Sequence, residues 1–429
     1  MKISGENGVA SNRGWNPSIV ALGIGTVFGT VGEGIFGLAT IVAVLHLKGS
    51  ALSIGSMMVL MTLPSILLAP FQGVFLDRFN IRSLAIASNL LRALIILAFA
   101  FVVWGRASSL TDLYVAITAY YIVWYFMVPL SETMVARIAS KDGLHRGMVV
   151  LQGAWQAGAL GSAFLAGALL TVMPLHAVLI IVAGLDLMSG ASFLFVTLPT
   201  TEHVETTGAT LPQNVWHAMG GHLRSFRTDL TEGWRYIAAD NTILWLVLIT
   251  ATLHPFYQAI NTLLGPFNQN VLRGDSMSLG LIEGMAGVGS FVSALLCMRA
   301  KAFPRSFVYL VGSQLLLIGS VAAFLSISSI GVASGLYFLI GLFSGNAKIL
   351  SKSMLIQITE SGYSGRVLST SSLLALIAGV ASALLSGLFA LNSIPLAYLV
   401  AISLIAVGVV LAWRLKAATP GVVGSGTQA

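Results

Sequence analysis

The chain has 429 residues, of which 56% are hydrophobic and only 9% are charged. Soluble globular proteins carry about 25% charged residues, so water cannot be the main solvent for this surface. The net charge of +7 does not indicate a nucleic-acid partner, because the basic residues are spread over separate loops. The single cysteine, Cys297, excludes an internal disulfide and a cysteine metal cluster, and no pattern predicts a metal or a cofactor.

Apolar runs dominate the chain from residue 18 onward. About 20 apolar residues span a bilayer as a helix, and backbone amides in lipid must be bonded within the chain. Twelve such runs occur, too long and continuous for barrel strands, so the sequence predicts an all-α membrane protein with twelve transmembrane helices. The predicted spans are residues 18–45, 51–76, 83–104, 113–135, 147–171, 175–198, 242–268, 277–298, 306–327, 331–354, 367–390 and 394–415.

The ends and one long connection divide the chain into regions. Residues 1–17 are polar and show no cleavable signal pattern, so they are expected to be a tail ahead of a retained first helix. The only long connection is the polar linker 199–241, in which residues 215–239 fit an amphipathic helix. It separates a six-helix half at 18–198 from a second at 242–415, and residues 416–429 form a C-terminal tail.

Short sequence repeats relate the two halves. Gly-Ser-Ala-Leu-Ser-Ile-Gly at 49–55 enters the second span, and Gly-Asp-Ser-Met-Ser-Leu-Gly at 274–280 enters the eighth. Arg-Gly-Met-Val-Val at 146–150 and Ser-Gly-Arg-Val-Leu at 364–368 begin the fifth and eleventh spans. Two halves with the same membrane orientation are a parallel repeat, in which substrate binds between the halves near the middle of the membrane.

Lysine and arginine set the predicted orientation. With the N-terminus inside, 18 of the 22 basic residues fall in inner segments. Lys48, Arg106 and Arg273 fall in outer loops, and Arg92 lies within a span. The positive-inside rule therefore predicts a multi-pass cell-membrane protein with both termini in the cytoplasm.

The loop after the second span carries the most specific motif. Here Gly73, Asp77, Arg78 and Arg82 match a pattern of the major facilitator superfamily, Gly-x-x-x-Asp-Arg-x-Gly-Arg-Arg. Asn80 stands at the glycine position and is the next-best residue for a positive φ. The chain resembles this family over its whole length, in its twelve spans, its division into six plus six and its long middle loop.

The resemblance implies a gate on the cytoplasmic side. Gly73 would let the second helix pack closely on the eleventh, and Asp77 would face the positive N-terminal end of that helix near Gly365 and Arg366. This contact would hold the cytoplasmic side shut. Ile81 replaces a base of the family pattern, which weakens the charge relay, and a merely topogenic turn is the alternative.

Glu132 lies near the cytoplasmic end of the fourth span, close to Arg137. A local ion pair at the gate is expected there, with substrate contact as the alternative.

Three further stretches resemble the drug–proton antiporter branch, which includes macrolide-efflux proteins and enterobactin-type exporters. They are Gly-Ser-Ala-Leu at 49–52, Leu-Ala-Pro-Phe at 68–71 and Gly-Arg-Val at 365–367. Other antiporter branches have a central arginine in the fourth span and a Gly-Pro pair in the fifth. This chain has neither. Proton antiport is therefore implied by the resemblance to this branch alone.

Glu33 is the leading candidate for proton coupling, because ionisable residues within spans are costly and usually functional. It lies near the middle of the first span on a stripe with Gly25, Gly29 and Gly37, and such stripes mark close packing or a cavity. The alternative is a structural, hydrogen-bonded glutamate.

Three other charged residues lie within spans. Arg92 is predicted either to pair with a buried carboxylate or to bind an anionic group of the substrate. Asp186, on a face of small residues, is a second candidate for proton coupling, with structural support as the alternative. Glu283 is a candidate substrate contact that shares a face with Gly280 and Gly287.

Two groups of side chains are predicted to line a substrate cavity, with packing as the alternative. Aromatic faces bind flat or cationic ligands, and polar amides in a span usually face a cavity or another helix. The candidates are Tyr121, Trp124 and Tyr125 in the fourth span and His254, Gln258 and Asn261 in the seventh.

No phosphate-binding loop, zinc-protease motif or nucleophile elbow occurs, so the sequence predicts neither an enzyme nor direct use of ATP. The favoured function is a secondary active, proton-coupled exporter of a small amphipathic molecule, a drug or a siderophore-like metabolite. It is expected to act as a monomer in the lipid bilayer. An importer or uniporter of a small solute and a receptor that does not transport are the alternatives.

Overall fold

A computed structural model describes most of the chain. The described ranges are 16–47, 49–105, 109–139, 143–198, 214–299, 306–360 and 362–418. Within these ranges the backbone alone is described at 73–75, 77–78, 145, 214–222, 225, 298–299, 306–307 and 415–418.

Every regular element in the described ranges is helical. The first half comprises α1 (Pro17–His46), α2 (Ala51–Arg78), α3 (Ile81–Gly105), α4 (Leu110–Trp124), α5 (Met127–Ile138), α6 (Leu144–Val172), α7 (Leu175–Ser192) and the short 3-10 helix η1 (Phe193–Phe195). The second comprises α9 (Asn241–Asn270), α10 (Ser276–Arg299), α11 (Ser306–Phe324), α12 (Ile330–Ile358), α13 (Ser364–Ala390) and α14 (Ile394–Ala418), and α8 (Asn214–Ala239) connects the two.

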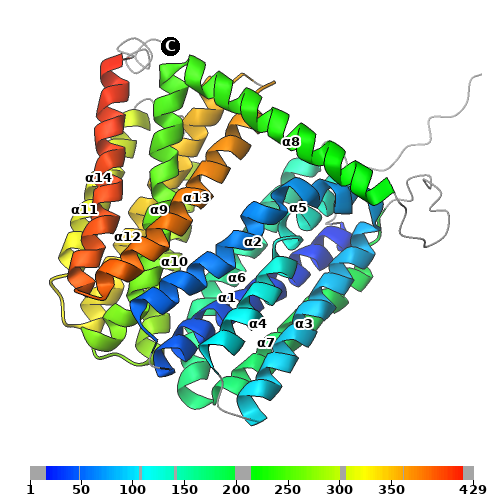
Figure 1. Ribbon diagram of the computed structural model, residues 1–429, viewed down its shortest axis with the longest axis horizontal. Coiled ribbons are helices and arrows are strands. Elements are labelled where there is room, and N and C mark those ends of the chain that lie inside the picture. The colour runs from blue at the N-terminus through cyan, green and yellow to red at the C-terminus, as the bar shows by residue number, and fades with distance from the viewer. Residues whose placement is uncertain are drawn as a thin grey trace, which may run out of the picture.

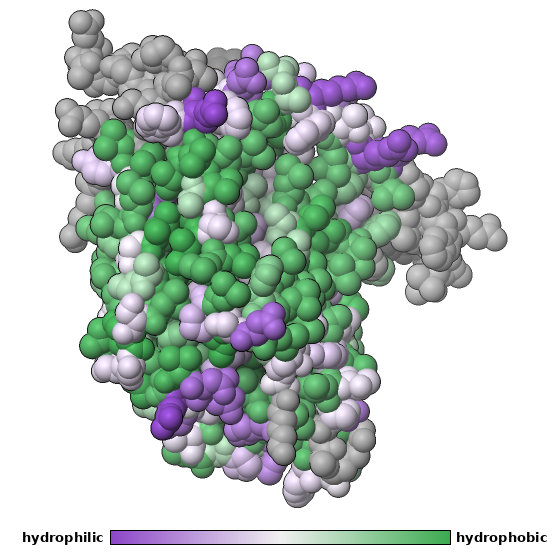
Figure 2. All heavy atoms as spheres, turned by 60° about the vertical axis from the view of Figure 1, so that its left-hand side comes forward, coloured by the Kyte–Doolittle hydropathy of each residue, from purple (hydrophilic) through white to green (hydrophobic). Residues whose placement is uncertain are grey.

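The predicted all-helical membrane fold is confirmed. In the described ranges, eleven segments are long and apolar enough to cross a membrane, and the apolar helix Val308–Phe324 corresponds to the ninth predicted span. Figure 2 shows a largely apolar surface between hydrophilic groups gathered toward the two ends of the molecule. This distribution fits a bundle surrounded by lipid.

The predicted fourth span at 113–135 forms two helices, because Pro129 interrupts it. Proline has no backbone N–H, so the carbonyl of Tyr125, four residues earlier, lacks its helical partner. Residues 125 and 126 form a turn between α4 and α5. The Gln72 side-chain amide on α2 donates a 3.0 Å hydrogen bond to the Tyr125 carbonyl and satisfies it.

The two halves pack with the symmetry expected of a repeat. Within the halves, α1 packs on α6 and α7, and α9 packs on α13 and α14. Between them, α2 packs along α13 and α10 along α6. Each of these pairs joins the second span of one half to the fifth of the other, as a two-fold axis between the halves requires.

The helix expected at 215–239 is present as α8. It packs against α2, α9 and α13 and runs across one end of the bundle, over both halves (Figure 1). We call this the linker end and the other the opposite end. Helix α14 finishes at the linker end (Figure 1).

The halves touch most closely toward the opposite end, through glycines. A Cβ added at Gly280 of α10 would lie 2.6 Å from the Cα of Gly167 on α6. A Cβ at Gly55 of α2 would lie 2.6 Å from the carbonyl oxygen of Ala383 on α13, and one at Gly387 would lie 2.8 Å from the Cα of Leu52. These backbones approach closely because the side chains between them are missing.

The linker end is more loosely joined. Helix α5 packs on α1, α3, α4 and α6 of its own half, and α12 packs on α9, α10 and α11 of the other. A Cβ at Gly365, near the start of α13, would meet no atom within 4 Å. Helix α8 packs on both α2 and α13 at this end.

A substitution of Gly280 by alanine tests the close contact between the halves. The new methyl group overpacks the interface against Gly167 and Ala163, so we expect a loss of about 1–3 kcal/mol of stability. Thermal unfolding of the purified protein in detergent measures it. Gly335→Ala is the matched control, because an added Cβ there meets nothing within 4 Å. Equal unfolding midpoints for the two variants would contradict the packing described.

Candidate functional site

Glu33 lies in the middle of α1 and is half-buried. The hydroxyl of Tyr121 on α4 donates a 2.7 Å hydrogen bond to its Oε1 atom. Gly37 lies beside this bond, since a Cβ there would be in ordinary contact with the same hydroxyl at 3.8 Å. Of the glycine stripe noted in the sequence, Gly37 lies toward α4, whereas Gly25 and Gly29 pack against Ser189 of α7.

Arg92 and Asp186 form an ion pair with each other, and both side chains are fully buried. The pair joins α3 to α7. Gly29 of α1 makes room for it, because a Cβ there would lie 3.1 Å from Ser189 Oγ and 3.7 Å from the Arg92 guanidinium. The sequence identified both charges but gave no signal that they face each other.

The aromatic residues of α4 connect the ion pair to Glu33. The Arg92 guanidinium lies 5.1 Å from the ring centroid of Tyr120 and 4.6 Å from that of Trp124. Tyr121 lies beside Tyr120, with centroids 5.6 Å apart, and Tyr125 follows at 6.3 Å. Cation–π contacts of this kind stabilise a desolvated guanidinium, so Trp124 has a structural partner in Arg92.

The three polar residues of α9 face different partners. Gln258 is buried and donates a 2.8 Å hydrogen bond to the Thr62 hydroxyl of α2, which links the two halves. His254 packs on α13, where a Cβ at Gly379 would lie 2.6 Å from its imidazole ring. Asn261 is half-buried one turn beyond Gln258.

Glu283 of α10 is half-buried, and its Oε2 atom has no hydrogen-bond partner in the described part of the chain. It lies close enough to Glu33 for the two charges to interact. Tyr257 of α9 interacts electrostatically with both carboxylates and is 57% exposed. Carboxylates from the two halves thus lie within electrostatic range of each other, an arrangement that could not be read from sequence spacing.

The motif after α2 is described in part. The helical backbone of α2 runs through Gly73, Asp77 and Arg78, but their side chains lie outside the described residues. Arg82 donates a 3.1 Å hydrogen bond from Nε to the Phe193 carbonyl and a second bond to the carbonyl of Leu194. It therefore ties the start of α3 to η1.

The ion pair expected between Glu132 and Arg137 does not form. Both side chains are exposed on α5, and the ion pairs within the described ranges do not include this one. Five positions along a helix place the two residues on different faces, which explains the difference.

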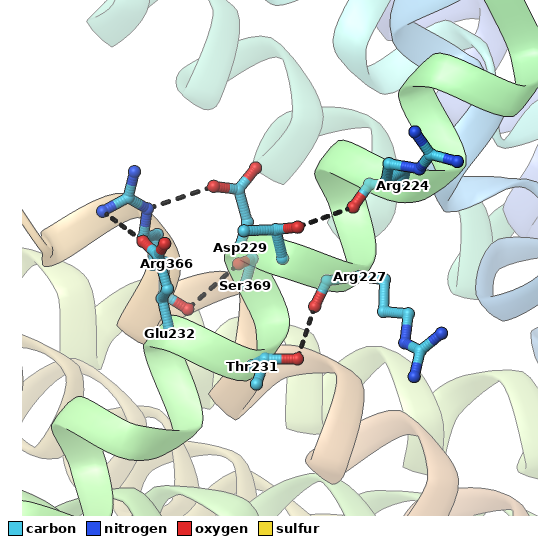
Figure 3. A network of polar contacts seen from close by, with 8 residues as sticks. Arg224, Arg227, Asp229, Thr231, Glu232, Arg366 and Ser369 are labelled. Atoms are coloured by element: carbon cyan, nitrogen blue, oxygen red, sulfur yellow. Dashed lines mark hydrogen bonds and ion pairs between the residues drawn. The ribbon is translucent and has the colours of Figure 1, made fainter.

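Arg366 pairs with the linker helix (Figure 3). Its Nε atom lies 3.1 Å from Asp229 Oδ1 and its Nη1 atom 3.0 Å from Glu232 Oε2. Gly233 lets the helices approach, since a Cβ there would lie 2.8 Å from the carbonyl oxygen of Arg366. The i, i+3 spacing places the two acids on one face of α8, but nothing in the sequence identified Arg366 as their partner.

Two tyrosines extend this contact between α8 and α13. The rings of Tyr236 and Tyr363 stack with centroids 4.4 Å apart and an interplanar angle of 10°. The guanidinium of Arg366 lies 5.6 Å from the Tyr363 ring centroid, and the amide of Glu360 donates a 3.3 Å hydrogen bond to the Tyr236 hydroxyl. The linker helix is therefore bound to the start of α13 by ionic, aromatic and hydrogen-bond contacts together.

Comparison with known proteins agrees with this architecture. Residues 22–300 match the Major Facilitator Superfamily. The chain belongs to this family. Its major facilitator fold makes it a membrane transporter rather than an enzyme. No curated protein sequence matches the chain at a significant level.

Solved structures share the major facilitator fold with this chain. A bacterial homologue of the human lysosomal transporter Spinster, in an inward-facing and unoccupied conformation, has a TM-score of 0.66 at 12% identity over 93% of this chain and 95% of its own. A bacterial homologue of the iron transporter ferroportin, in an inward-facing state, has a TM-score of 0.69 at 17% identity over 93% and 98%. The nucleoside transporter NupG has a TM-score of 0.64 at 14% identity over 93% and 99%.

Asp186→Asn tests whether the buried pair is structural in this facilitator. The change leaves a buried guanidinium without its counter-charge, so we expect a loss of about 3–5 kcal/mol, measured as a lower unfolding midpoint in detergent. Replacing both partners by apolar residues, as in Arg92→Met with Asp186→Leu, should recover most of this loss. A stable Asp186→Asn protein that has lost only proton coupling would instead make Asp186 a proton carrier.

Proposed function

We propose that this facilitator is a proton-coupled exporter of small amphipathic molecules, either drugs or siderophore-like metabolites, that works by alternating access. The observation that carries the proposal is the pair of carboxylates, Glu33 and Glu283, which come from opposite halves and lie within electrostatic range of each other. Their negative charges repel each other, and a proton or a cationic group between them relieves the repulsion. Protonation and substrate binding would therefore compete at one place.

The transporter is proposed to lie in the cell membrane, with its linker end facing the cytoplasm. The distribution of lysine and arginine over the loops supports this orientation. Helix α14 finishes at that end, so the C-terminal tail would be cytoplasmic, as the sequence predicts.

The conformation is proposed to be the one open toward the cytoplasm. In support, the close glycine contacts between the halves lie toward the opposite end, whereas Gly365 at the linker end has open space around it. Two of the similar solved structures are described as inward-facing. Rocking of the halves about the central carboxylates would then expose the site to the other side.

In the proposed cycle, Glu33 carries the proton. The Tyr121 hydroxyl donates to its carboxylate and so orients it, while the space shared with Glu283 and Tyr257 admits the substrate. Of the cavity candidates, Asn261 and Tyr125 are half-buried and are proposed to contact the substrate. Gln258 is instead bonded to Thr62, and Trp124 packs on Arg92.

Glu33→Gln should abolish proton coupling. A proton moving through 100 mV supplies about 2.3 kcal/mol, enough for roughly fiftyfold accumulation of substrate. In everted membrane vesicles energised by respiration, addition of ethidium, a macrolide or a catecholate siderophore should release protons with the wild type and not with this variant. Glu360→Gln, which changes an exposed carboxylate outside the site, is the control.

Unchanged proton release by Glu33→Gln would contradict the role of Glu33. Substrate movement that never depends on pH, in the wild type as in the variant, would favour a uniporter. Movement of the substrate in the same direction as the protons, down their gradient, would favour an importer.

The gate is proposed to depend on which acid Arg366 meets. In this structure Asp229 and Glu232 of α8 hold it, and in the state closed at the linker end it would turn to Asp77. One guanidinium cannot pair closely with both helices when α2 and α13 separate. The linker helix would therefore stabilise the open linker end.

Removing both acids of α8, as Asp229→Asn with Glu232→Gln, should shift the protein toward closure of the linker end. The pairs are partly exposed and worth about 1 kcal/mol together, a shift of about fivefold in population. Electron spin resonance distances between labels at Val149 and Ile356, in a Cys297→Ser background, measure it. Glu360→Gln removes a nearby exposed charge and should leave the distances unchanged. Longer distances in the double variant would contradict the proposal.

A further inference from the structure

The linker helix α8 has two chemically different faces. One face is held by the bundle: Asp229 and Glu232 bind Arg366, Tyr236 stacks on Tyr363, and Ile237 is fully buried. Both acids of α8 are therefore engaged in contacts within the protein. What remains on the other side of the helix carries a different charge.

The second face is basic and partly apolar. Arg224, Arg227 and Arg235 are exposed, together with Leu223 and Trp234, which are 48% and 46% exposed. At 100° per residue these five positions fall within a third of the helix circumference. We call them the basic face of α8.

The arginines of the basic face are free to bind a ligand. Within the described part of the chain, the ion pairs of α8 use its two acids and none of these three arginines. In Figure 3, Arg224 and Arg227 point away from Arg366 and its acidic partners. The hydroxyls of Thr228 and Thr231 bond to carbonyls of α8 itself, so they do not compete for a ligand.

Helix α8 lies at the level where the lipid-facing surface of the bundle ends. The helix packs on α2 and α13, both of which expose large apolar side chains such as Leu67 (59%) and Ile377 (51%) along the bundle surface. It crosses the end of these helices, where the apolar band gives way to hydrophilic groups (Figures 1 and 2). That is the depth of phospholipid headgroups.

We propose that the basic face of α8 binds the anionic phospholipid headgroups of the adjacent leaflet. Guanidinium groups bind phosphate through paired hydrogen bonds, and tryptophan favours the headgroup level of a bilayer. Basic residues near an anionic membrane surface each add attraction that falls off within a Debye length. Arg366 pairs with both acids of α8 and offsets one of their two negative charges, so the three arginines outweigh the one that remains. Lipid binding goes beyond the proposed export activity and does not depend on it.

A single-cysteine reporter tests the proposal in the full-length protein. Cys297 is the only cysteine, so Cys297→Ser with Thr231→Cys allows an environment-sensitive fluorophore to be placed within the basic face. The detergent-purified protein is titrated with short-chain phosphatidylglycerol, with the matching phosphatidylcholine and with inorganic phosphate. We expect a saturable blue shift with phosphatidylglycerol at far lower concentration than with the other two.

Charge variants decide whether the arginines carry the binding. Changing Arg224, Arg227 and Arg235 together to glutamine should raise the midpoint for phosphatidylglycerol about a hundredfold, or about fivefold for each arginine. The triple change to lysine keeps the charge and should stay within a few-fold of the parent. Arg137→Gln, an exposed arginine on α5, is the control for overall charge.

Three results would overturn the proposal. They are an unchanged midpoint in the glutamine variant, an equal response to phosphatidylcholine, and saturation by inorganic phosphate alone. The second would mean that the face meets lipid through Leu223 and Trp234 only, and the third that it is a site for a free anion. Equal unfolding midpoints of the lysine and glutamine variants show that both are folded, so a lost response reports on charge.

Discussion

A charge inside an apolar membrane core must find its partner within the protein, and this constraint organises the first half of the chain. Arg92 and Asp186 meet that need by pairing with each other. The pair in turn needs the small residues of α1 and the rings of α4 around it, so four helices are fixed by one ionic contact. Burying such a pair is not itself a source of stability, but breaking it is costly.

Glu33 and Glu283 are the exceptions to this rule of pairing. Neither forms an ion pair with a basic side chain in the described part of the chain. Among the described residues, the partner that hydrogen-bonds to Glu33 is the Tyr121 hydroxyl. Charged groups that a protein leaves uncompensated in a membrane are those whose state changes with a ligand or a proton. The ion pair of Arg92 and Asp186 therefore has a structural role, whereas the unpaired Glu33 and Glu283 are the candidates for function.

Local sequence patterns predicted much of the fold because they depend on neighbours along the chain. The spans, the linker helix and the glycine stripe beside Glu33 all follow from periodicity and hydropathy. The sequence analysis did not predict the turn at Tyr125, although Pro129 is part of the sequence. A proline often bends a membrane helix without ending it. Partners from distant helices were a different matter. No spacing shows that Arg92 faces Asp186, that Arg366 faces α8, or that Glu33 and Glu283 lie within electrostatic range of each other.

The hydrogen bond from Gln72 to the Tyr125 carbonyl has a mechanical consequence. Since Pro129 already removes the helical bond at this point, α5 can tilt relative to α4 without breaking a bond of either helix. The first half then contains a joint between α4 and α5. The amide that bonds to the Tyr125 carbonyl belongs to α2. A displacement of α2 therefore acts directly on Tyr125, whose ring lies next to Tyr121, the partner of Glu33.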